Sequence, residues 1–125
     1  MTENEICTRV IGTALEIHTA LGPGLLESSY QHCLGYELKK SEFFIEEEKS
    51  MPLVFKEVIL ECGYRIDLLV EKKLVVEIKS VSELEDIHLA QILTYLRMGN
   101  YKLGLLLNFN AVSMKDGIKR VVNRL

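Results

Sequence analysis

The sequence predicts an α/β fold in which a mixed β-sheet is flanked by helices. Apolar residues recur at helical spacing near the start of the chain and again around residues 83–98, whereas residues 43–79 and 102–123 read as strands. The predicted order is therefore α-α-β-β-β-α-β-β, which favours helices packed on a mixed sheet. With 125 residues, 48% of them hydrophobic, we expect one domain spanning residues 1–125.

Two helices are expected first. Thr2 and Glu5 have the spacing of a capping box, and apolar residues follow every three or four positions, so a first helix should cover Asn4–Ala20. The turn Gly22-Pro23-Gly24 should end it, because both residue types interrupt helices. A second helix should begin just after this turn and end near Lys39. The residues expected to face the core from it are Leu26, Tyr30, Cys33, Leu34 and Leu38.

The middle of the chain is rich in strand-forming segments, and a third helix and two more strands follow them. The tight spacing of the first segments predicts hairpins. The final strand alternates only weakly, which is typical of a sheet edge. The segments expected as strands are Phe43–Glu47, Leu53–Phe55, Val58–Glu61, Tyr64–Val70 and Leu74–Lys79, then the helix Glu83–Met98 and the strands Lys102–Leu107 and Ile118–Asn123.

Composition and charge exclude several classes of protein. A net charge of -3 argues against a protein that coats nucleic acid through a basic surface. The basic segment 115–125 is interpreted as a solvated face, with phosphate contact as the alternative. An acidic start and the lack of a long apolar run predict a cytoplasmic protein without a membrane span. Three widely spaced cysteines predict neither disulfides nor a zinc site.

Asp67, Glu77 and Lys79 are charged residues that interrupt the two apolar strands on either side of the tripeptide 71–73. Pairing Val70 with Leu74 brings the apolar faces of these strands together, places Ile66 opposite Ile78, and keeps Ile66, Leu68 and Val70 on one face. The same register places Asp67 opposite Glu77, with Lys79 on the same face as Glu77. Opposed carboxylates destabilise a strand pair unless a cation or a lysine lies between them.

This arrangement favours a divalent-metal site for phosphodiester hydrolysis. Carboxylate oxygens of Asp67 and Glu77, together with the backbone carbonyl of Ile78, suit Mg²⁺ or Mn²⁺. Lys79 would orient or deprotonate the attacking water, whose pKa a bound metal lowers. The alternative for this spacing alone is an exposed hairpin with paired surface ions.

Two helices offer supporting groups. Glu27, in the first turn of the second helix, would bind a metal-held water, although an acid at this position is also favoured by the helix dipole alone. Gln91 and Tyr95 follow His88 on a polar stripe of the third helix and would hydrogen-bond a phosphate or the lysine. Their alternative is a half-exposed helix boundary where the tyrosine packs its ring.

Taken together, these segments resemble the GxxExxY protein family, a branch of the PD-(D/E)XK nuclease superfamily. The Gln91-x-x-x-Tyr95 spacing is also similar to a motif of RecB-type exonucleases. The resemblance covers nearly the whole chain. The matching segments are Gly24-x-x-Glu27-x-x-Tyr30, Arg65–Val70, Val76–Ser80, Ile87–Leu96, Leu107–Asn110 and Lys115–Arg120.

The resemblance implies a restriction-endonuclease-like core and a Mg²⁺-dependent nuclease acting on DNA in preference to RNA. Asp67, Glu77 and Lys79 would form the nuclease triad, with Glu27 as the helical acid. Ile66 departs from the proline that often precedes the aspartate, and the four cysteines of an iron–sulfur clasp are absent. Two alternatives stay open: a silent nuclease-fold protein that binds nucleic acid or a protein partner, and a homodimer subunit with vestigial carboxylates.

Overall fold

The computed structural model describes all 125 residues and confirms the predicted order of helices and strands. A short 3₁₀-helix, η1, is added before the last strand. The elements are α1 (Glu3–Leu21), α2 (Glu27–Lys40), β1 (Ile45–Phe55), β2 (Val58–Val70), β3 (Leu74–Lys79), α3 (Asp86–Gly99), β4 (Leu103–Asn108), η1 (Met114–Gly117) and β5 (Ile118–Val122).

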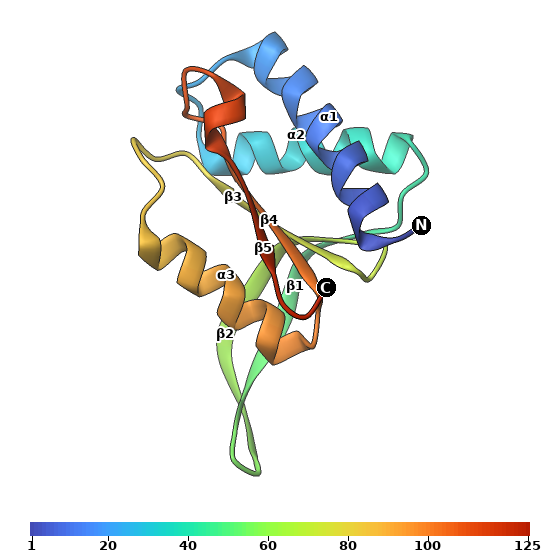
Figure 1. Ribbon diagram of the computed structural model, residues 1–125, viewed down its shortest axis with the longest axis vertical. Helices are drawn as coiled ribbons and strands as arrows, with labels where there is room; N and C mark the ends of the chain where they lie inside the picture. Colours follow the sequence, from blue (N-terminus) through green and yellow to red (C-terminus); the bar gives the residue numbers. More distant parts are fainter.

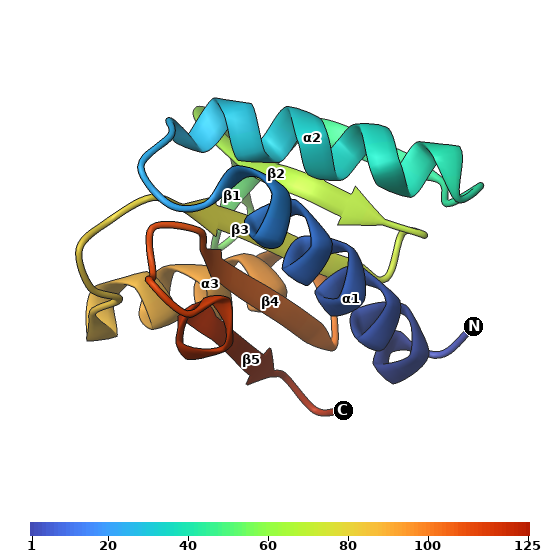
Figure 2. The ribbon, with the colours of Figure 1, turned by 90° about the horizontal axis from the view of Figure 1, so that it is seen from above.

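The five strands form one mixed sheet in the order β1-β2-β3-β4-β5. Only β3 and β4 run parallel; the other neighbours are antiparallel. Helix α3 connects the two parallel strands, as a crossover of this kind requires. Helices α1 and α2 cover one face of the sheet and α3 covers the other, which gives three layers (Figures 1 and 2). The predicted α/β architecture is confirmed.

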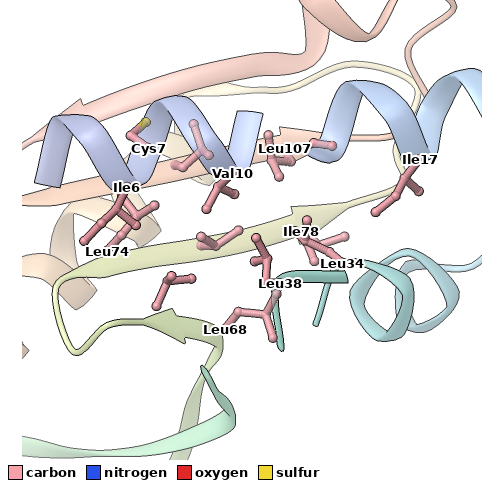
Figure 3. Packing of buried hydrophobic residues seen from close by; sticks show 14 of the residues in the cluster. Ile6, Cys7, Val10, Ile17, Leu34, Leu38, Leu68, Leu74, Ile78 and Leu107 are labelled. Carbon is pink, nitrogen blue, oxygen red and sulfur yellow. The ribbon is translucent and has the colours of Figure 1, made fainter. Parts of the chain in front are cut away.

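Each face of the sheet has its own hydrophobic core. Beneath α1 and α2, the larger core contains Ile6 and Val10 of α1, Leu34 of α2 and Leu74 of β3, all fully buried (Figure 3). Beneath α3, the smaller core is built around Ile92 and the surrounding strands. Because both faces are covered, β3 and β4 are buried along their length, as is typical of strands in parallel pairs.

The first helices follow the predicted signals, with two exceptions. The Thr2 side chain accepts from the Glu5 backbone N–H, and the Glu5 side chain accepts from Thr2 in return, which confirms the capping box. Leu26 was expected in the core but is 75% exposed, because it caps α2 from outside the helix. Cys33 is only partly buried and packs at the margin of the larger core.

Strands β1 and β2 form one long hairpin, although the sequence predicted shorter separate segments. The register shifts between Met51 and Leu53, where Pro52 has no N–H to donate and Gly63 on β2 has a φ of 79°. Beyond this irregularity the hairpin projects from the sheet as a two-stranded ribbon (Figure 1). We call residues 53–65 the projecting hairpin. Its exposed apolar residues are Val54, Phe55, Val58, Ile59, Leu60 and Tyr64.

No helix in this fold combines the length and the hydropathy that crossing a membrane would need.

Candidate active site

Asp67 and Glu77 lie where β2 and β3 separate. The turn between these strands has left-handed backbone at Glu71 and Lys72, with φ values of 53° and 56°. This geometry fits a tight hairpin turn and fixes the register. The pairs Val70–Leu74, Leu69–Val75 and Leu68–Val76 all form, as predicted. The pairing then stops.

Two carboxylates bridge the gap where the backbone pairing ends. The backbone N–H of Asp67 donates to Oε2 of Glu77 at 2.8 Å, and the backbone N–H of Ile78 donates to Oδ2 of Asp67 at 2.8 Å. The two side chains thus replace backbone hydrogen bonds between the diverging strands. We call Asp67, Glu77 and the backbone of Ile78 the carboxylate fork.

The fork coincides with a change of face along β2, which the sequence did not predict. Leu68 packs into the core beneath α1 and α2, whereas Ile66 packs beneath α3. The expectations that these residues share a face and that Ile66 pairs with Ile78 are therefore wrong. On β1, Glu48 lies opposite Asp67 with a left-handed φ of 51°, between the regular pairs on either side. This irregularity shifts the alternation of β2 and turns Asp67 toward β3.

Burial makes the carboxylate fork costly to ionise fully. Glu77 is 5% exposed. Its desolvation, followed by the negative charge of Asp67, raises the pKa of Glu77 from 4.5 to about 8. Desolvation also raises the pKa of Asp67, against the lowering effect of the Ile78 N–H bond. Without a cation, the pair therefore favours holding one proton at neutral pH.

The donor set of the fork fits a hard divalent cation. Every buried side-chain nitrogen and oxygen has a hydrogen-bond partner, yet Oδ1 of Asp67 and Oε1 of Glu77 accept none, so both atoms reach solvent. Along a strand, the N–H and C=O of one residue point the same way, so the Ile78 carbonyl also points into the fork. Three oxygens of this kind suit Mg²⁺ or Mn²⁺.

No group of three or more His, Cys, Asp or Glu side chains is arranged to hold a metal ion. The fork therefore provides two carboxylates and a carbonyl, with Glu27 outside this group. Mg²⁺ commonly keeps several of its waters and binds through one or two carboxylates. A two-carboxylate site is compatible with that preference.

Lys79 and Glu27 lie beside the fork without closing on it. Lys79 is half-buried and forms no salt bridge, so no lysine neutralises the two carboxylates directly. Its carbonyl accepts from the Phe109 N–H at 3.0 Å, which holds the end of β3 against β4. Oε1 of Glu27 accepts from the Ser80 N–H at 3.2 Å, so the helical acid contacts the residue after Lys79.

Tyr95 approaches the fork from α3, whereas Gln91 stays at the surface. Nε2 of Gln91 donates to Oη of Tyr95 at 3.4 Å. The Tyr95 side chain is mostly buried; its desolvation, followed by the charge of Glu77, raises the pKa of the phenol. Gln91 forms no hydrogen bond with Lys79, so the expected contact with the lysine is absent in this structure.

Gln31 and Glu48 belong to this neighbourhood although the sequence did not single them out. Nε2 of Gln31 donates to Oε1 of Glu48 at 3.0 Å and to the carbonyl of Asp67 at 3.4 Å. The negative charge of Glu48 helps to raise the pKa of both fork carboxylates. No signal in the sequence identifies Glu48, because its position depends on its left-handed backbone.

A second set of missed residues holds the loops on which Glu27 and Lys79 depend. Oδ1 of Asn108 accepts from the Val81 N–H, and Nδ2 of Asn108 donates to the Val81 carbonyl, so the amide clamps the chain just after β3. Oδ1 of Asn110 accepts from the Gly24 N–H, which anchors the turn before α2. The sequence identified the Leu107–Asn110 motif, but it did not predict that the two asparagines would bind these backbone segments.

The Gly24-x-x-Glu27-x-x-Tyr30 motif is completed by the same segment. The Tyr30 ring stacks on Phe109 with centroids 4.5 Å apart. Its hydroxyl donates to the Gly22 carbonyl at 2.6 Å and accepts from the Leu25 N–H at 3.1 Å. The tyrosine therefore fixes the turn that precedes Glu27.

A family model described as the PD-(D/E)XK nuclease superfamily matches residues 4–121 of the chain. The match reaches every strand of the sheet and includes the fork between β2 and β3. Proteins of this superfamily usually use divalent metal ions. No curated protein and no solved structure matches the chain.

Proposed function

Because the chain belongs to the PD-(D/E)XK nuclease superfamily, we propose that it is a Mg²⁺-dependent nuclease that hydrolyses phosphodiester bonds of DNA. The observation that carries this proposal is the carboxylate fork. Asp67 and Glu77 are held in place by backbone hydrogen bonds, each keeps one oxygen without a hydrogen-bond partner in the protein, and the charge of Lys79 acts on both.

In this proposal Asp67, Glu77 and the Ile78 carbonyl hold the cation. A divalent ion bound there would neutralise phosphoryl charge and lower the pKa of a bound water. The protein's own contribution is preorganisation: the fork carboxylates are fixed by short backbone hydrogen bonds, so little reorientation is needed on binding. A cation bound there would offset the repulsion between the two carboxylates and displace the proton that the raised pKa of Glu77 retains.

Lys79 is assigned to orient the attacking water and to take up its proton or stabilise the charge that develops on the phosphate. Its ammonium has no salt-bridge partner, which leaves it free for substrate. Glu27 supports this lysine through the Ser80 backbone, where it would also contact a water held by the cation. Tyr95 and Gln91 would support the fork from α3.

The narrower assignment to the GxxExxY branch is supported by the way its motifs interlock here. Tyr30, the last residue of that motif, stacks on Phe109 of the C-terminal motif, and both segments position the Glu27 turn. We propose on this basis that residues 1–125 act as one nuclease domain of this branch, with DNA as the preferred partner and RNA as the lesser one.

The test is cleavage of single-stranded and duplex DNA, and of RNA, with Mg²⁺, Mn²⁺ or EDTA. Wild type should cleave only with metal, and Lys79→Ala should lose roughly a hundred-fold or more in rate, as expected for loss of a general acid–base group. Lys40→Ala, at the exposed end of α2, is the matched control. Equal background from wild type and Lys79→Ala would reject the catalytic assignment.

A second candidate is a nuclease-fold protein that binds nucleic acid without cutting it. It is favoured by one observation: Asp67 and Glu77 bond to backbone N–H groups, so they have a structural role that does not require catalysis. Binding should then survive Asp67→Asn, which keeps an oxygen for the Ile78 N–H. Retained binding with no hydrolysis in Mn²⁺ would favour this candidate; metal-dependent cleavage would exclude it.

A further inference from the structure

A small cavity lies between the base of the projecting hairpin and α3, next to the carboxylate fork. Its volume is about 190 Å³, below the roughly 300 to 1,000 Å³ of pockets for whole small-molecule ligands. No charged residue lines it, so it is unsuited to a phosphate or another ion. The lining residues are Leu53, Tyr64, Gln91, Thr94, Tyr95 and Met98.

The walls of this cavity combine an exposed aromatic face with hydrogen-bonding groups. Tyr64 is 42% exposed and its ring lies 6.3 Å from that of Tyr95, with 60° between the planes. The tilt leaves the two rings unstacked on each other. Gln91 and Thr94 of α3 also line the cavity. Nε2 of Gln91 donates to Oη of Tyr95 and Oγ1 of Thr94 donates to the Ala90 carbonyl, so the oxygens of both side chains are left as acceptors. This combination suits a flat ring with a polar edge.

The cavity is continuous with the fork along two elements. On β2, Tyr64 precedes Asp67 by three residues, which is about 10 Å along a strand. On α3, Tyr95 lines the cavity, and the negative charge of Glu77 helps to raise the pKa of its phenol after the larger effect of desolvation. A nucleic-acid strand with a phosphate at the fork would therefore bring a neighbouring base within reach of Tyr64.

Resting on the nuclease function proposed above, we infer that this cavity binds one unpaired nucleobase, stacked on Tyr64, and that the substrates are single-stranded or locally unpaired nucleic acids. Bases in a closed duplex are stacked on each other and cannot enter. Every base can stack on an aromatic side chain, so the cavity distinguishes unpaired from paired bases and does not distinguish one base sequence from another.

The test measures binding by fluorescence anisotropy in Ca²⁺, using labelled single-stranded DNA, single-stranded RNA and duplex DNA. Tyr64→Leu keeps an apolar side chain without an aromatic face, and should weaken binding of single strands by about ten-fold, within the range for one stacked base. Tyr64→Phe should stay within about two-fold of wild type. The DNA and RNA arms show which strand the cavity serves.

Tyr36→Leu is the matched control, because Tyr36 is an exposed tyrosine of α2, remote from α3. Thr94→Phe is a second test at an exposed helix position, where the added ring should fill the cavity and weaken single-strand binding without removing Tyr64. Thermal melts of all variants check folding. An oligonucleotide with 2-aminopurine should be quenched by wild type and less by Tyr64→Leu.

Unchanged single-strand binding by Tyr64→Leu and Thr94→Phe, or equal losses for duplex and single strands, would overturn this inference. If light scattering gave these two variants a lower molecular mass than wild type, with nucleic-acid binding unchanged, the surface would instead be assigned to a second copy of the chain. If no variant cleaves but Tyr64→Leu still weakens binding, the nuclease proposal fails and the base site stands. If wild type cleaves and Tyr64→Leu matches it in binding and rate, only the base site fails.

Discussion

The two halves of β2 have opposite environments. From Ile66 to Val70 the strand is packed between two helical layers, and its side chains are largely buried. From Val58 to Arg65 it is paired with β1 alone and its residues are exposed, although several are apolar. Two-stranded ribbons have little stability of their own. The inner half therefore supports the fold, whereas the outer half is free to serve binding.

The largest expected effect comes from comparing the same residue type in the two halves. Leu68→Ala removes a fully buried side chain and should lower the free energy of unfolding by about 2 to 5 kcal/mol. Leu60→Ala, in the exposed half, should change it by less than about 0.5 kcal/mol. Urea denaturation measures both values. Similar losses from the two variants would show that the projecting hairpin belongs to the cooperative core.

The second prediction uses the raised pKa of Glu77. Between its usual pKa of 4.5 and the folded value of about 8, the folded protein holds a proton that the unfolded chain has released. The free energy of unfolding of the metal-free protein should therefore fall as pH rises through this window, by at most about 1.4 kcal/mol per pH unit.

Glu77→Gln should flatten this profile, because the amide does not titrate and its oxygen can still accept from the Asp67 N–H. Glu61→Gln, in the exposed half of β2, serves as the control and should leave the profile unchanged. Urea titrations in EDTA between pH 5 and 8 measure the difference. A slope shared by wild type and Glu77→Gln would mean that Glu77 is not its source.

A smaller effect is expected at the turn before Glu27. Tyr30→Phe keeps the ring that stacks on Phe109 but removes the hydroxyl bonded to Gly22 and Leu25. The free energy of unfolding should fall by about 1 to 2 kcal/mol. Tyr36→Phe removes an exposed hydroxyl and should be neutral. Faster hydrogen exchange at Leu25 in Tyr30→Phe alone would locate the loss in this turn.

The smallest effect is expected at the outer end of the projecting hairpin. Ile59 is 68% exposed, so Ile59→Thr should change the free energy of unfolding by less than about 0.5 kcal/mol. Threonine also keeps a β-branched side chain in the strand. A loss above about 1 kcal/mol, measured by urea denaturation, would show that something in the protein covers this residue.

The inner half of β2 was largely predictable, because local rules determine it. The three-residue connection 71–73 and the matching of apolar faces fixed the pairs from Val70–Leu74 to Leu68–Val76. The prediction failed one residue later, where Glu48 adopts a left-handed backbone. Glutamate is not a residue type that signals this conformation, so the change of face at Asp67 could not be inferred.

The supporting contacts were less predictable than the fork itself. Asp67, Glu77 and Lys79 stand out because they interrupt apolar strands. Gln31 and Asn108 act through contacts with residues 17 to 36 positions away, and no local pattern specifies such contacts. The C-terminal motif included Asn108, but it did not predict that this side chain binds the backbone of Val81.

The hydrogen bonds of the carboxylate fork have a consequence for how lineages of this protein would diverge. A descendant that lost cleavage would still need a side-chain oxygen at both positions to join β2 to β3, so only an acid or its amide would be retained there. The Lys79 side chain makes no such bond, so it would drift once catalysis ceased to matter. Among relatives, the lysine, together with the charge of the two acids, is therefore the marker that separates working enzymes from inherited scaffolds.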